Sequence, residues 1–384
     1  MIPVDQAQAM VLDMARPMGT EVVPLHRASG RLLAVAVAAR RDQPPFDASA
    51  MDGYAVGGDP EIGAVLPVIG ESRAGAAFHG DLTGAIRIST GAPVPAQATR
   101  VIMQEHVRRD GDTITITELS EGRHIRAQGQ DFRAGQTFAP RRLRPADIGL
   151  LAAMDVAEVS VFRRPDIAII STGDELAAPG SPMRDDQIPA SNAFTLQAMI
   201  EEAGATARVL PIATDDADTL RAVFALAKGA DVVVTIGGAS VGDHDLVGPI
   251  ARELGMDLSF HKIAMRPGKP LMAGRMGDGV MLGLPGNPVS SFVCAQIFLL
   301  PLIRAMTGQT ALPDVQSARL AAEVPANGPR THFMRGRLDA GGLVPFSEQD
   351  SSLMLRLTEA NVLLIRPPND PARPAGDEVS VLPI

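Results

Sequence analysis

Cysteine and aromatic residues are scarce in this chain of 384 residues. It contains one cysteine, one tyrosine, 12 phenylalanines and no tryptophan. A single cysteine excludes an intramolecular disulfide scaffold and a thiolate zinc or iron–sulfur site, so any metal must be bound by oxygen or imidazole. The small number of aromatic rings also leaves few surfaces on which nucleic-acid bases could stack.

Basic charge and long apolar runs are lacking as well. The 35 Lys and Arg residues are outnumbered by 44 Asp and Glu residues, which gives a net charge of −9. No general attraction to nucleic acids or anionic membranes is therefore expected. The N-terminal segment does not resemble a signal peptide. The most apolar stretch, Val289 to Ile303, is interrupted by serines and a proline and is predicted to be too short to span a bilayer. We expect a cytoplasmic protein.

The patterns that are present indicate several domains, because a chain of this length is too long for one hydrophobic core. Apolar residues at i, i+3, i+4 and i+7 from Ala7 predict an amphipathic helix with Asp5 as its N-cap. From Glu21 to Phe162, short apolar runs between Gly, Pro and Asp turns predict a β-rich region. Val315 to Ile384 has the same pattern and predicts a small terminal β domain after a linker.

Strands and helices alternate after Pro165. This alternation predicts βαβ units and a parallel sheet covered by helices on both faces. The predicted strands are Asp166–Ser171, Ala207–Ile212, Asp231–Ile236, Lys269–Ala273 and Val280–Leu284, and the predicted helices are Asn192–Ala203, Asp215–Lys228 and Pro288–Met306. The fold class is therefore α/β and multidomain, with a three-layer parallel-sheet domain, β-rich domains and a small C-terminal β-barrel-like domain.

The loop GGASVGDHD, residues 237–245, follows a predicted buried strand, where open α/β sheets place their ligands. Its glycines, Gly237, Gly238 and Gly242, would let backbone N–H groups approach a phosphate, and Ser240 adds a hydroxyl. The alternative is a tight strand-to-helix turn without a ligand. Asp245 favours a bound cation, because carboxylates would repel a bare phosphate.

Acidic side chains recur at the same predicted sheet edge. The segment STGDEL places Asp174 and Glu175 after the first parallel strand, and Asp215 and Asp216 follow the next. Hard oxygen ligands favour Mg²⁺ over a softer metal. Each acid taken alone could equally be solvated or cap a helix.

Two further segments are candidate anion sites. In HKIAMRPGKP, the cations Lys262, Arg266 and Lys269 lie around a Pro–Gly turn and could clamp an oxyanion. In GLPGNPVSS, Pro285 and Pro288 stiffen a turn before a helix start at which Asn287 could be the N-cap. The alternatives are a solvated turn for the first segment and a well-capped helix for the second.

Nine short motifs, in this order, resemble the molybdopterin molybdenumtransferases, the bacterial MoeA group and the E domain of gephyrin. The motifs are PPFDASAMDGYAV, STGAPVP, IRAQGQDF, STGDEL, SNAFTL, GGASVGDHD, MRPGKP, GLPGNPVSS and MRG. The resemblance covers essentially the whole chain. Arg266 departs from the family, in which related sequences carry lysine; its planar fork could alter the geometry of anion binding.

The resemblance implies the transfer of molybdenum from molybdate to adenylylated molybdopterin (molybdopterin-AMP), with Mg²⁺ dependence and release of AMP. It also implies a homodimer with a shared active cleft, and possible partners among molybdopterin adenylyltransferases and molybdoenzymes. The implied domains are residues 1–41 with 135–165, 42–134, 166–308 and 312–384.

Site residues follow from the matching motifs. The implied catalytic residues are Asp52, Thr90, Asp131, Glu175, Asp215 and Asp245, of which Glu175, Asp215 and Asp245 would hold the metal. The substrate-binding residues would be Gly237, Gly238, Ser240, Gly242, Lys262, Arg266, Lys269, Pro285, Pro288, Arg335 and Ser351. Two rival functions are a molybdopterin adenylyltransferase and a non-catalytic scaffold on the same fold.

Overall fold

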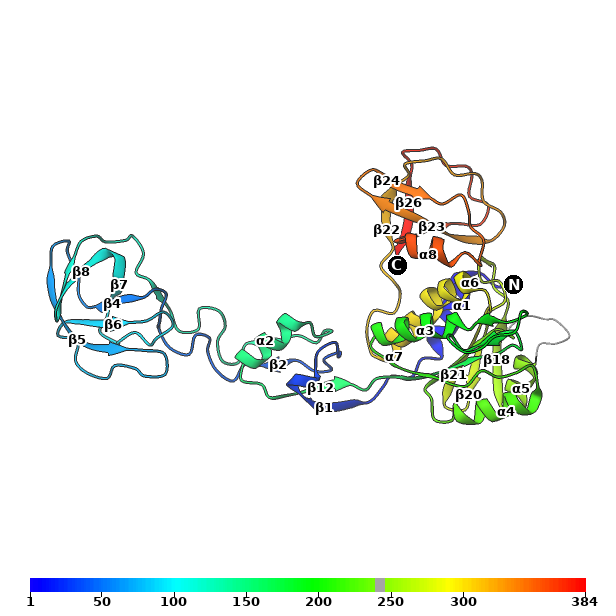
Figure 1. The fold of residues 1–384 in the computed structure, drawn as a ribbon, viewed down its shortest axis with the longest axis horizontal. Coiled ribbons are helices and arrows are strands. Elements are labelled where there is room, and N and C mark those ends of the chain that lie inside the picture. Colours follow the sequence, from blue (N-terminus) through cyan, green and yellow to red (C-terminus); the bar gives the residue numbers. More distant parts are fainter. Residues whose placement is uncertain (239–245) are drawn as a thin grey trace. The chain divides into compact units, whose positions relative to one another are not determined.

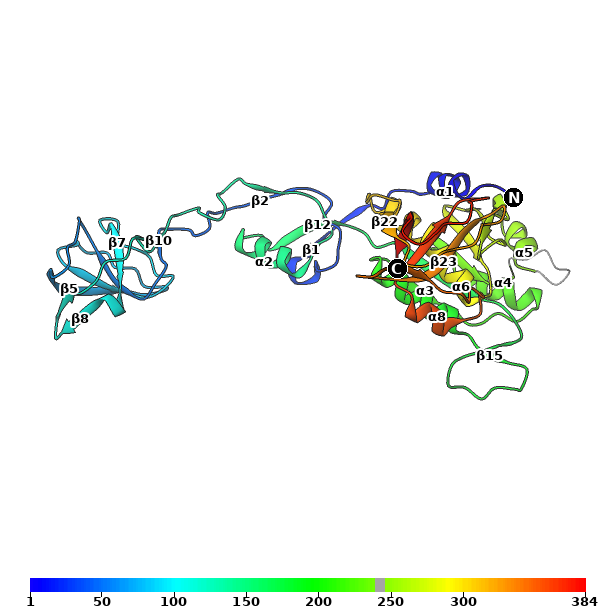
Figure 2. The same ribbon diagram turned by 90° about the horizontal axis from the view of Figure 1, so that it is seen from above.

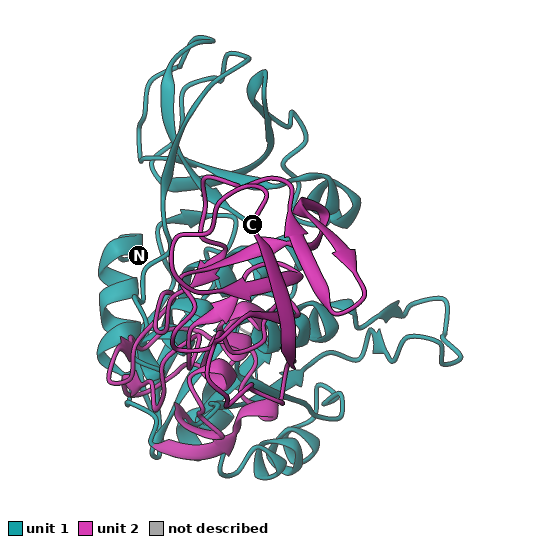
Figure 3. Ribbon diagram, turned by 90° about the vertical axis from the view of Figure 1, so that its left-hand side faces the viewer, with its two compact units in different colours: residues 1–19, 163–384 teal, residues 20–162 magenta. Residues whose placement is uncertain are grey.

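The computed structural model describes residues 1–238 and 246–384. Contacts within the chain divide it into two compact units, coloured separately in Figure 3. Unit 1 comprises residues 1–19 and 163–384, and unit 2 comprises residues 20–162. The four-domain division stated above, with its boundaries, stays a prediction.

The centre of unit 1 is a six-stranded sheet in the order β16-β13-β17-β21-β20-β18. The first four strands are parallel, as the alternation of strands and helices predicts. β20 and β18 are antiparallel additions at one edge, so the sheet is mixed rather than wholly parallel. The strands are β13 (Asp166–Ser171), β16 (Thr206–Val209), β17 (Val232–Ile236), β18 (Met256–His261), β20 (Met272–Met276) and β21 (Gly279–Leu284).

Helices cover both faces of this sheet, which confirms the three-layer prediction (Figure 1). One face packs against α1 (Val4–Asp13), α3 (Ser191–Glu202), α6 (Pro288–Cys294) and α7 (Leu300–Met306). The other face packs against α4 (Ala217–Leu226) and α5 (Val247–Glu253). Alternate residues of each strand contribute to the two cores: Val234 of β17 faces the first group of helices, and Val233 faces the second.

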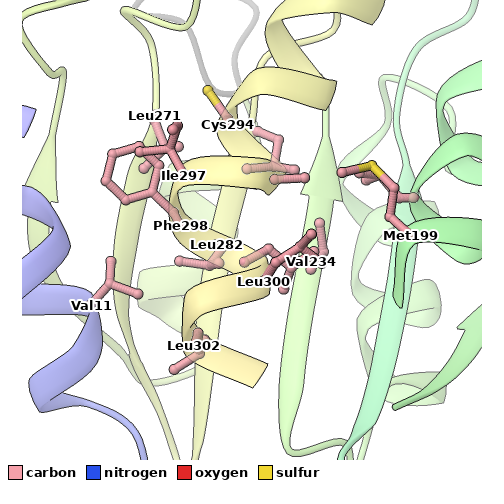
Figure 4. Close-up of a cluster of buried hydrophobic side chains, with 14 of the residues drawn as sticks. Val11, Met199, Val234, Leu271, Leu282, Cys294, Ile297, Phe298, Leu300 and Leu302 are labelled. Carbon is pink, nitrogen blue, oxygen red and sulfur yellow. The ribbon is translucent and has the colours of Figure 1, made fainter. Parts of the chain in front are cut away.

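The helix that fills the larger core runs from Pro288 to Met306, with a π-helical turn, η3 (Ala295–Leu299), between α6 and α7. In Figure 4 its side chains pack against the strands, with α1 on one side and α3 on the other; the labelled residues are Val11, Met199, Val234, Leu271, Leu282, Cys294, Ile297, Phe298, Leu300 and Leu302. Cys294 is a core residue as expected, and burial raises the pKa of its thiol.

Two sequence-based expectations about helices are wrong. Pro288–Met306 has 19 residues and is long and apolar enough to cross a membrane, so the prediction that this region is too short does not hold. Its most apolar stretch is nevertheless 78% buried inside the structure, and core packing accounts for its composition. Asp5 lies in the first turn of α1 but is not the N-cap, which is Pro3.

The C-terminal part of unit 1 is a six-stranded sheet. Its strands are β19 (Met265–Arg266), β22 (Gln316–Arg319), β23 (Thr331–Asp339), β24 (Gly342–Pro345), β25 (Val362–Arg366) and β26 (Glu378–Pro383), and α8 (Met354–Glu359) accompanies them. β19 belongs by sequence to the α/β part and pairs in parallel with β23. This pairing joins the two parts of unit 1.

Unit 2 is β-rich, as predicted, and contains one six-stranded sheet and three two-stranded sheets. A six-stranded sheet has apolar clusters on its two faces. Its strands are β4 (Gly53–Val56), β5 (Val65–Ser72), β6 (Ala85–Ile88), β7 (Arg100–Met103), β8 (Val107–Asp110) and β9 (Thr113–Ile116). One two-stranded sheet pairs β1 (Thr20–Pro24) with β12 (Glu158–Phe162) and shares an apolar cluster with α2 (Pro145–Ala153). The other two pair β2 (Val37–Ala38) with β11 (Thr137–Phe138) and β3 (Ala48–Ser49) with β10 (Ile125–Arg126).

Candidate functional site

A pocket of about 530 Å³ lies at the carboxyl ends of β13, β17 and β21. Three successive parallel strands end there, which is where open α/β sheets place ligands. It is lined by Ser171, Thr172, Glu175, Leu176, Ile188, Pro189, Ala190, Ser191, Asn192, Ile236, Gly237, Gly238, Pro270, Pro285, Gly286, Asn287, Pro288 and Ser352. All of these residues belong to unit 1. The strand β15 (Ile188–Pro189), reached by the projecting loop in Figure 2, supplies part of one wall.

The two predicted glycines at the end of β17 lie in the pocket wall. Gly237 and Gly238 have positive φ values of 87° and 60°, which glycine adopts without strain. A Cβ atom on Gly237 would lie 2.9 Å from the carbonyl oxygen of Thr172, and one on Gly238 would collide with Val247. The absence of side chains here keeps the backbone close to the pocket. The predicted residues Ser240, Gly242 and Asp245 lie outside the described residues.

Two acidic turns meet beside this pocket. The carboxylate of Asp174 accepts a hydrogen bond from the backbone N–H of Asp215 at 3.1 Å. Glu175 lines the pocket and is exposed. Asp216 has a structural role instead, because it caps α4 and accepts hydrogen bonds from Thr219 that lower the pKa of Asp216. The structure thus brings Asp174 and Asp215 together and puts Glu175 in the pocket wall.

The carboxylate of Glu175 is the group that fits a divalent cation. Within residues 1–238 and 246–384 it forms no hydrogen bond or ion pair, so its oxygens are free to bind. The same residues contain no cluster of three His, Cys, Asp or Glu side chains that could hold a metal by themselves. Substrate oxygens, water or residues beyond these ranges would have to complete the coordination.

The three predicted cations lie on the segment after β18. Lys262 has a positive φ of 79°, and its backbone N–H donates to the carbonyl of Leu271. Arg266 and Lys269 are exposed. None of the three side chains lines the pocket, although Pro270, which follows Lys269, does. The structure therefore carries this basic segment to the pocket edge but does not bring the cationic groups into its wall.

The loop before α6 forms part of the pocket wall. Pro285 and Pro288 both line it, as predicted for substrate-binding residues, and Pro288 occupies the first turn of α6. Asn287 is at the N-cap position, but its side chain does not cap the helix. Its Nδ2 donates instead to the hydroxyl oxygen of Ser351 at 2.9 Å. The N–H of Val289 donates to the Ser351 carbonyl at 3.0 Å, so this N–H is not free for an anion.

Arg335 lies inside the C-terminal sheet and not in the pocket wall. Its side chain is only 1% exposed, and its guanidinium donates to the backbone carbonyls of Glu348, Asp350 and Leu353. Ser351 contacts Asn287 as described, and its neighbour Ser352 is the one that lines the pocket. Ser352 donates two hydrogen bonds to the Asp350 carboxylate and thereby lowers the pKa of Asp350.

Three predicted residues belong to unit 2. The N–H and hydroxyl of Thr90 donate to Oδ1 of Asp52 at 2.7 and 3.2 Å, so the structure joins these two residues. The carboxylate of Asp131 is exposed, and no hydrogen bond links it to this pair within the described ranges. The loops that carry Asp52 and Thr90 therefore meet in unit 2.

Sequence reasoning missed several polar residues of the pocket. Ser171 and Thr172 end β13, and Ser191 begins α3. Asn192 donates to the carbonyl of Gly286 at 2.7 Å and so ties the start of α3 to the loop before α6. The sequence signal for Ser191 and Asn192 is the motif SNAFTL, in which a polar pair opens a helix. No local signal points to Ser352.

The fold and the pocket define a multidomain α/β protein whose parallel sheet carries a pocket at its strand ends, with β-rich regions before and after that sheet in the sequence. Three family models match the chain in succession. The first, "MoeA N-terminal region (domain I and II)", matches residues 2–154. "Probable molybdopterin binding domain" matches residues 168–305, which include most of the pocket, and "MoeA C-terminal region (domain IV)" matches residues 317–384.

Relatives that match most of the chain have the same family name. Molybdopterin molybdenumtransferase 2 of Mycobacterium tuberculosis (strain CDC 1551 / Oshkosh) is 36% identical, with 98% of each chain covered. The molybdopterin molybdenumtransferase of Haemophilus influenzae is 37% identical, over 80% of this chain and 78% of that protein. A crystal structure of a molybdopterin biosynthesis MoeA protein from Pyrococcus horikosii superposes with a TM-score of 0.81 and 30% identity, covering 100% of this chain and 98% of that one. The chain belongs to the MoeA family of molybdopterin molybdenumtransferases.

Proposed function

We propose that this chain is a molybdenum insertase, which transfers molybdenum from molybdate to adenylylated molybdopterin and releases AMP. The observation that carries the proposal is the pocket at three adjacent strand ends of the domain that matches the molybdopterin-binding model. Relatives of nearly the same length are named for molybdenum transfer to molybdopterin. A pocket of about 530 Å³ is of the size that takes a small molecule.

The pocket offers two kinds of surface to such a substrate. The backbone at Gly238 and the hydroxyls of Ser171 and Ser191 suit phosphate oxygens, whereas the N–H of Gly237 already donates to the Leu284 carbonyl at 3.0 Å. Ile188 and other apolar residues of the wall suit a flat organic ring. We propose that the phosphates of the adenylylated pterin bind at the glycine-lined end.

Glu175 is our candidate Mg²⁺ ligand within the described residues. Its carboxylate lines the pocket and has no partner among residues 1–238 and 246–384, while Asp215 lies at the adjoining turn. Together with Asp245 they form the ligand set that we propose. A magnesium ion held there would polarise the phosphoanhydride as a Lewis acid. Glu175 itself would orient the anionic substrate by holding its counter-ion at the glycine-lined end.

Molybdate and the adenylylated pterin are both anions, so bringing them together costs Coulomb energy. Two unit charges 4 Å apart repel by about 1 kcal/mol in water and by several times more in a drier site. Lys262, Arg266 and Lys269 have no hydrogen-bond or ion-pair partners for their side chains within the described ranges, and they lie on the segment leading to Pro270 in the pocket wall. We propose that these cations receive molybdate and reduce the repulsion.

We further propose a homodimer with a shared cleft, to which Asp52, Thr90 and Asp131 contribute. Molybdopterin adenylyltransferases and molybdoenzymes are the protein partners that we expect from the chemistry of the substrate and the product. Nucleic acids and membranes are not expected partners, given the net charge of −9.

The experiment measures AMP release and pterin-bound molybdenum after adenylylated molybdopterin, molybdate and Mg²⁺ are added to the purified chain. Glu175→Gln keeps the shape of the side chain and removes its charge. We expect turnover to fall at least about tenfold and the Mg²⁺ concentration for half-maximal activity to rise. The matched control is Glu323→Gln, an exposed glutamate outside the pocket, which should retain activity.

Two outcomes would contradict the proposal. Consumption of ATP with formation of adenylylated molybdopterin would identify an adenylyltransferase. Tight pterin binding that molybdate never alters would indicate a scaffold. Normal turnover by Glu175→Gln would remove only Glu175 from the mechanism.

A further inference from the structure

A loop from the C-terminal sheet, residues 348–353, contributes Ser352 to the pocket wall. The Ser351 carbonyl accepts the N–H of Val289, and the Ser351 hydroxyl accepts a hydrogen bond from Asn287 at 2.9 Å. Its neighbour Ser352 lines the pocket. The two contacts connect residues 62 and 64 positions apart in the sequence, and they set where this wall stands relative to the start of α6.

The loop is held from within its own domain by Arg335. This residue lies on β23 with a side chain that is 1% exposed. Nη1 donates to the Leu353 carbonyl at 2.9 Å, and Nη2 donates to the carbonyls of Asp350 at 2.7 Å and Glu348 at 3.3 Å. One planar guanidinium thus binds three carbonyls of a six-residue loop, an arrangement that the compact ammonium of lysine cannot reproduce.

A second brace is formed by Gln349. Its side-chain Oε1 accepts the N–H of Arg335 at 3.0 Å, and its Nε2 donates to the Arg335 carbonyl at 2.9 Å and to the Phe346 carbonyl at 2.8 Å. The side-chain amide therefore clamps the backbone of β23 at the same residue whose guanidinium holds the loop. Neither Gln349 nor Arg335 lines the pocket.

We propose that Arg335 and Gln349 are positioning residues: they hold loop 348–353 in the shape that sets Ser351 against α6 and Ser352 in the pocket wall. Arg335 acts through the loop, because its guanidinium donates to three loop carbonyls and does not line the pocket. The expected effect on substrate affinity rests on the function proposed above. The claim that Arg335 and Gln349 hold the loop does not. Substrate affinity should depend on the brace, because a wall that is not preorganised must be ordered by the substrate when it binds.

The test compares Gln349→Ala with a matched control, Asn361→Ala. Asn361 clamps the backbone of Leu338, three residues further along β23, with the same pair of hydrogen bonds, both 2.8 Å long. We expect Gln349→Ala to speed amide hydrogen exchange at Val289 at least tenfold and to raise KM for adenylylated molybdopterin about tenfold, with kcat within twofold. Asn361→Ala should leave the exchange rate at Val289 and KM unchanged.

Arg335→Lys separates a brace from a direct substrate contact. If Arg335 acted as a charge on the substrate, lysine would preserve KM and Val289 exchange would stay slow. We expect instead that Arg335→Lys reproduces the Gln349→Ala changes, and that the double variant is no worse than either single variant.

If amide hydrogen exchange at Val289 were unchanged in both Gln349→Ala and Arg335→Lys, the proposal that these two residues hold the loop would be wrong. Faster exchange with unchanged KM would overturn its role in positioning the pocket wall. The exchange measurement uses the chain without substrate, so it decides the brace even if the wild-type chain showed no molybdenum transfer, a result that would overturn the proposed function alone.

Discussion

In the C-terminal sheet, the surroundings of His332 determine the pKa of its side chain. His332 on β23 is 8% exposed, and β19 and β25 place Arg266 and Arg366 directly beside it. Burial first, and then the positive charges of Arg266 and Arg366, lower the pKa of His332 from 6.5 to about 4. The imidazole is therefore neutral at neutral pH. Since the same residue is basic in the unfolded chain, its protonation is linked to stability.

The pH dependence of unfolding should reveal this linkage. Above pH 6.5 His332 is neutral in both states and has no effect. Between pH 6.5 and about 4 the unfolded chain takes up a proton that the folded chain refuses, so stability falls as the pH falls. Between pH 7 and pH 5 we expect a loss of about 2 kcal/mol, absent in His332→Gln, measured by urea denaturation.

The exposed His26 provides the comparison for this measurement. His26→Gln should show the same loss between pH 7 and pH 5 as the wild-type chain. An identical pH dependence in His332→Gln and the wild-type chain would refute the assignment to His332.

Strand ends are the elements that build the pocket. β13, β17 and β21 are buried parallel strands, and the turns that follow them supply Glu175, Gly237 and Pro285. The continuous apolar runs of these strands predicted them well, because a strand buried on both faces needs no polar alternation. The antiparallel strand β18 was missed, since its sequence MDLSFH mixes polar and apolar residues at the sheet edge.

The turn after β17 offers a test of the close backbone approach. Gly237→Ala adds a Cβ atom only 2.9 Å from the Thr172 carbonyl oxygen and imposes a side chain on a φ of 87°. We expect a shift of the pocket backbone and at least a tenfold weaker affinity for adenylylated molybdopterin, measured by direct binding. Backbone strain from a side chain at this positive φ alone costs about 1–2 kcal/mol of stability.

Gly180→Ala is the matched control for Gly237→Ala. Its φ is 84°, but a Cβ atom there meets nothing within 4 Å, and it does not line the pocket. It should show the loss of stability that comes from backbone strain without the loss of affinity. Equal affinity in the two variants would show that space at Gly237 is not required for binding.

The whole molecule consists of two units, and every residue that lines the pocket comes from unit 1. Unit 2 is a single insertion whose ends leave unit 1 side by side, since the Arg163 N–H donates to the Gly19 carbonyl at 2.8 Å. Unit 2 has its own apolar clusters, so neither unit depends on the other for a core.

Removal of unit 2 should therefore leave the pocket intact. We expect a chain in which a short Gly-Ser linker replaces residues 20–162 to unfold cooperatively and to bind adenylylated molybdopterin within about threefold of the full chain. It should lose molybdenum transfer if Asp52, Thr90 and Asp131 contribute to the reaction. Circular dichroism, direct binding and AMP release measure the three properties. A folded deletion variant that does not bind would show that unit 2 is needed for the pocket.

The sequence alone determined most strands and helices of the α/β region and the residues at the ends of its parallel strands. These depend on local periodicity and on turns such as STGDEL and GLPGNPVSS, whose partners lie within one βαβ unit. Only the tertiary structure decided that Arg335 is buried in a loop brace, that Asp216 caps α4 and that Ser352 enters the pocket wall. The physical reason is that a polar side chain takes its role from the partners it meets on folding, and for the pocket wall these partners lie more than 60 residues apart in the chain.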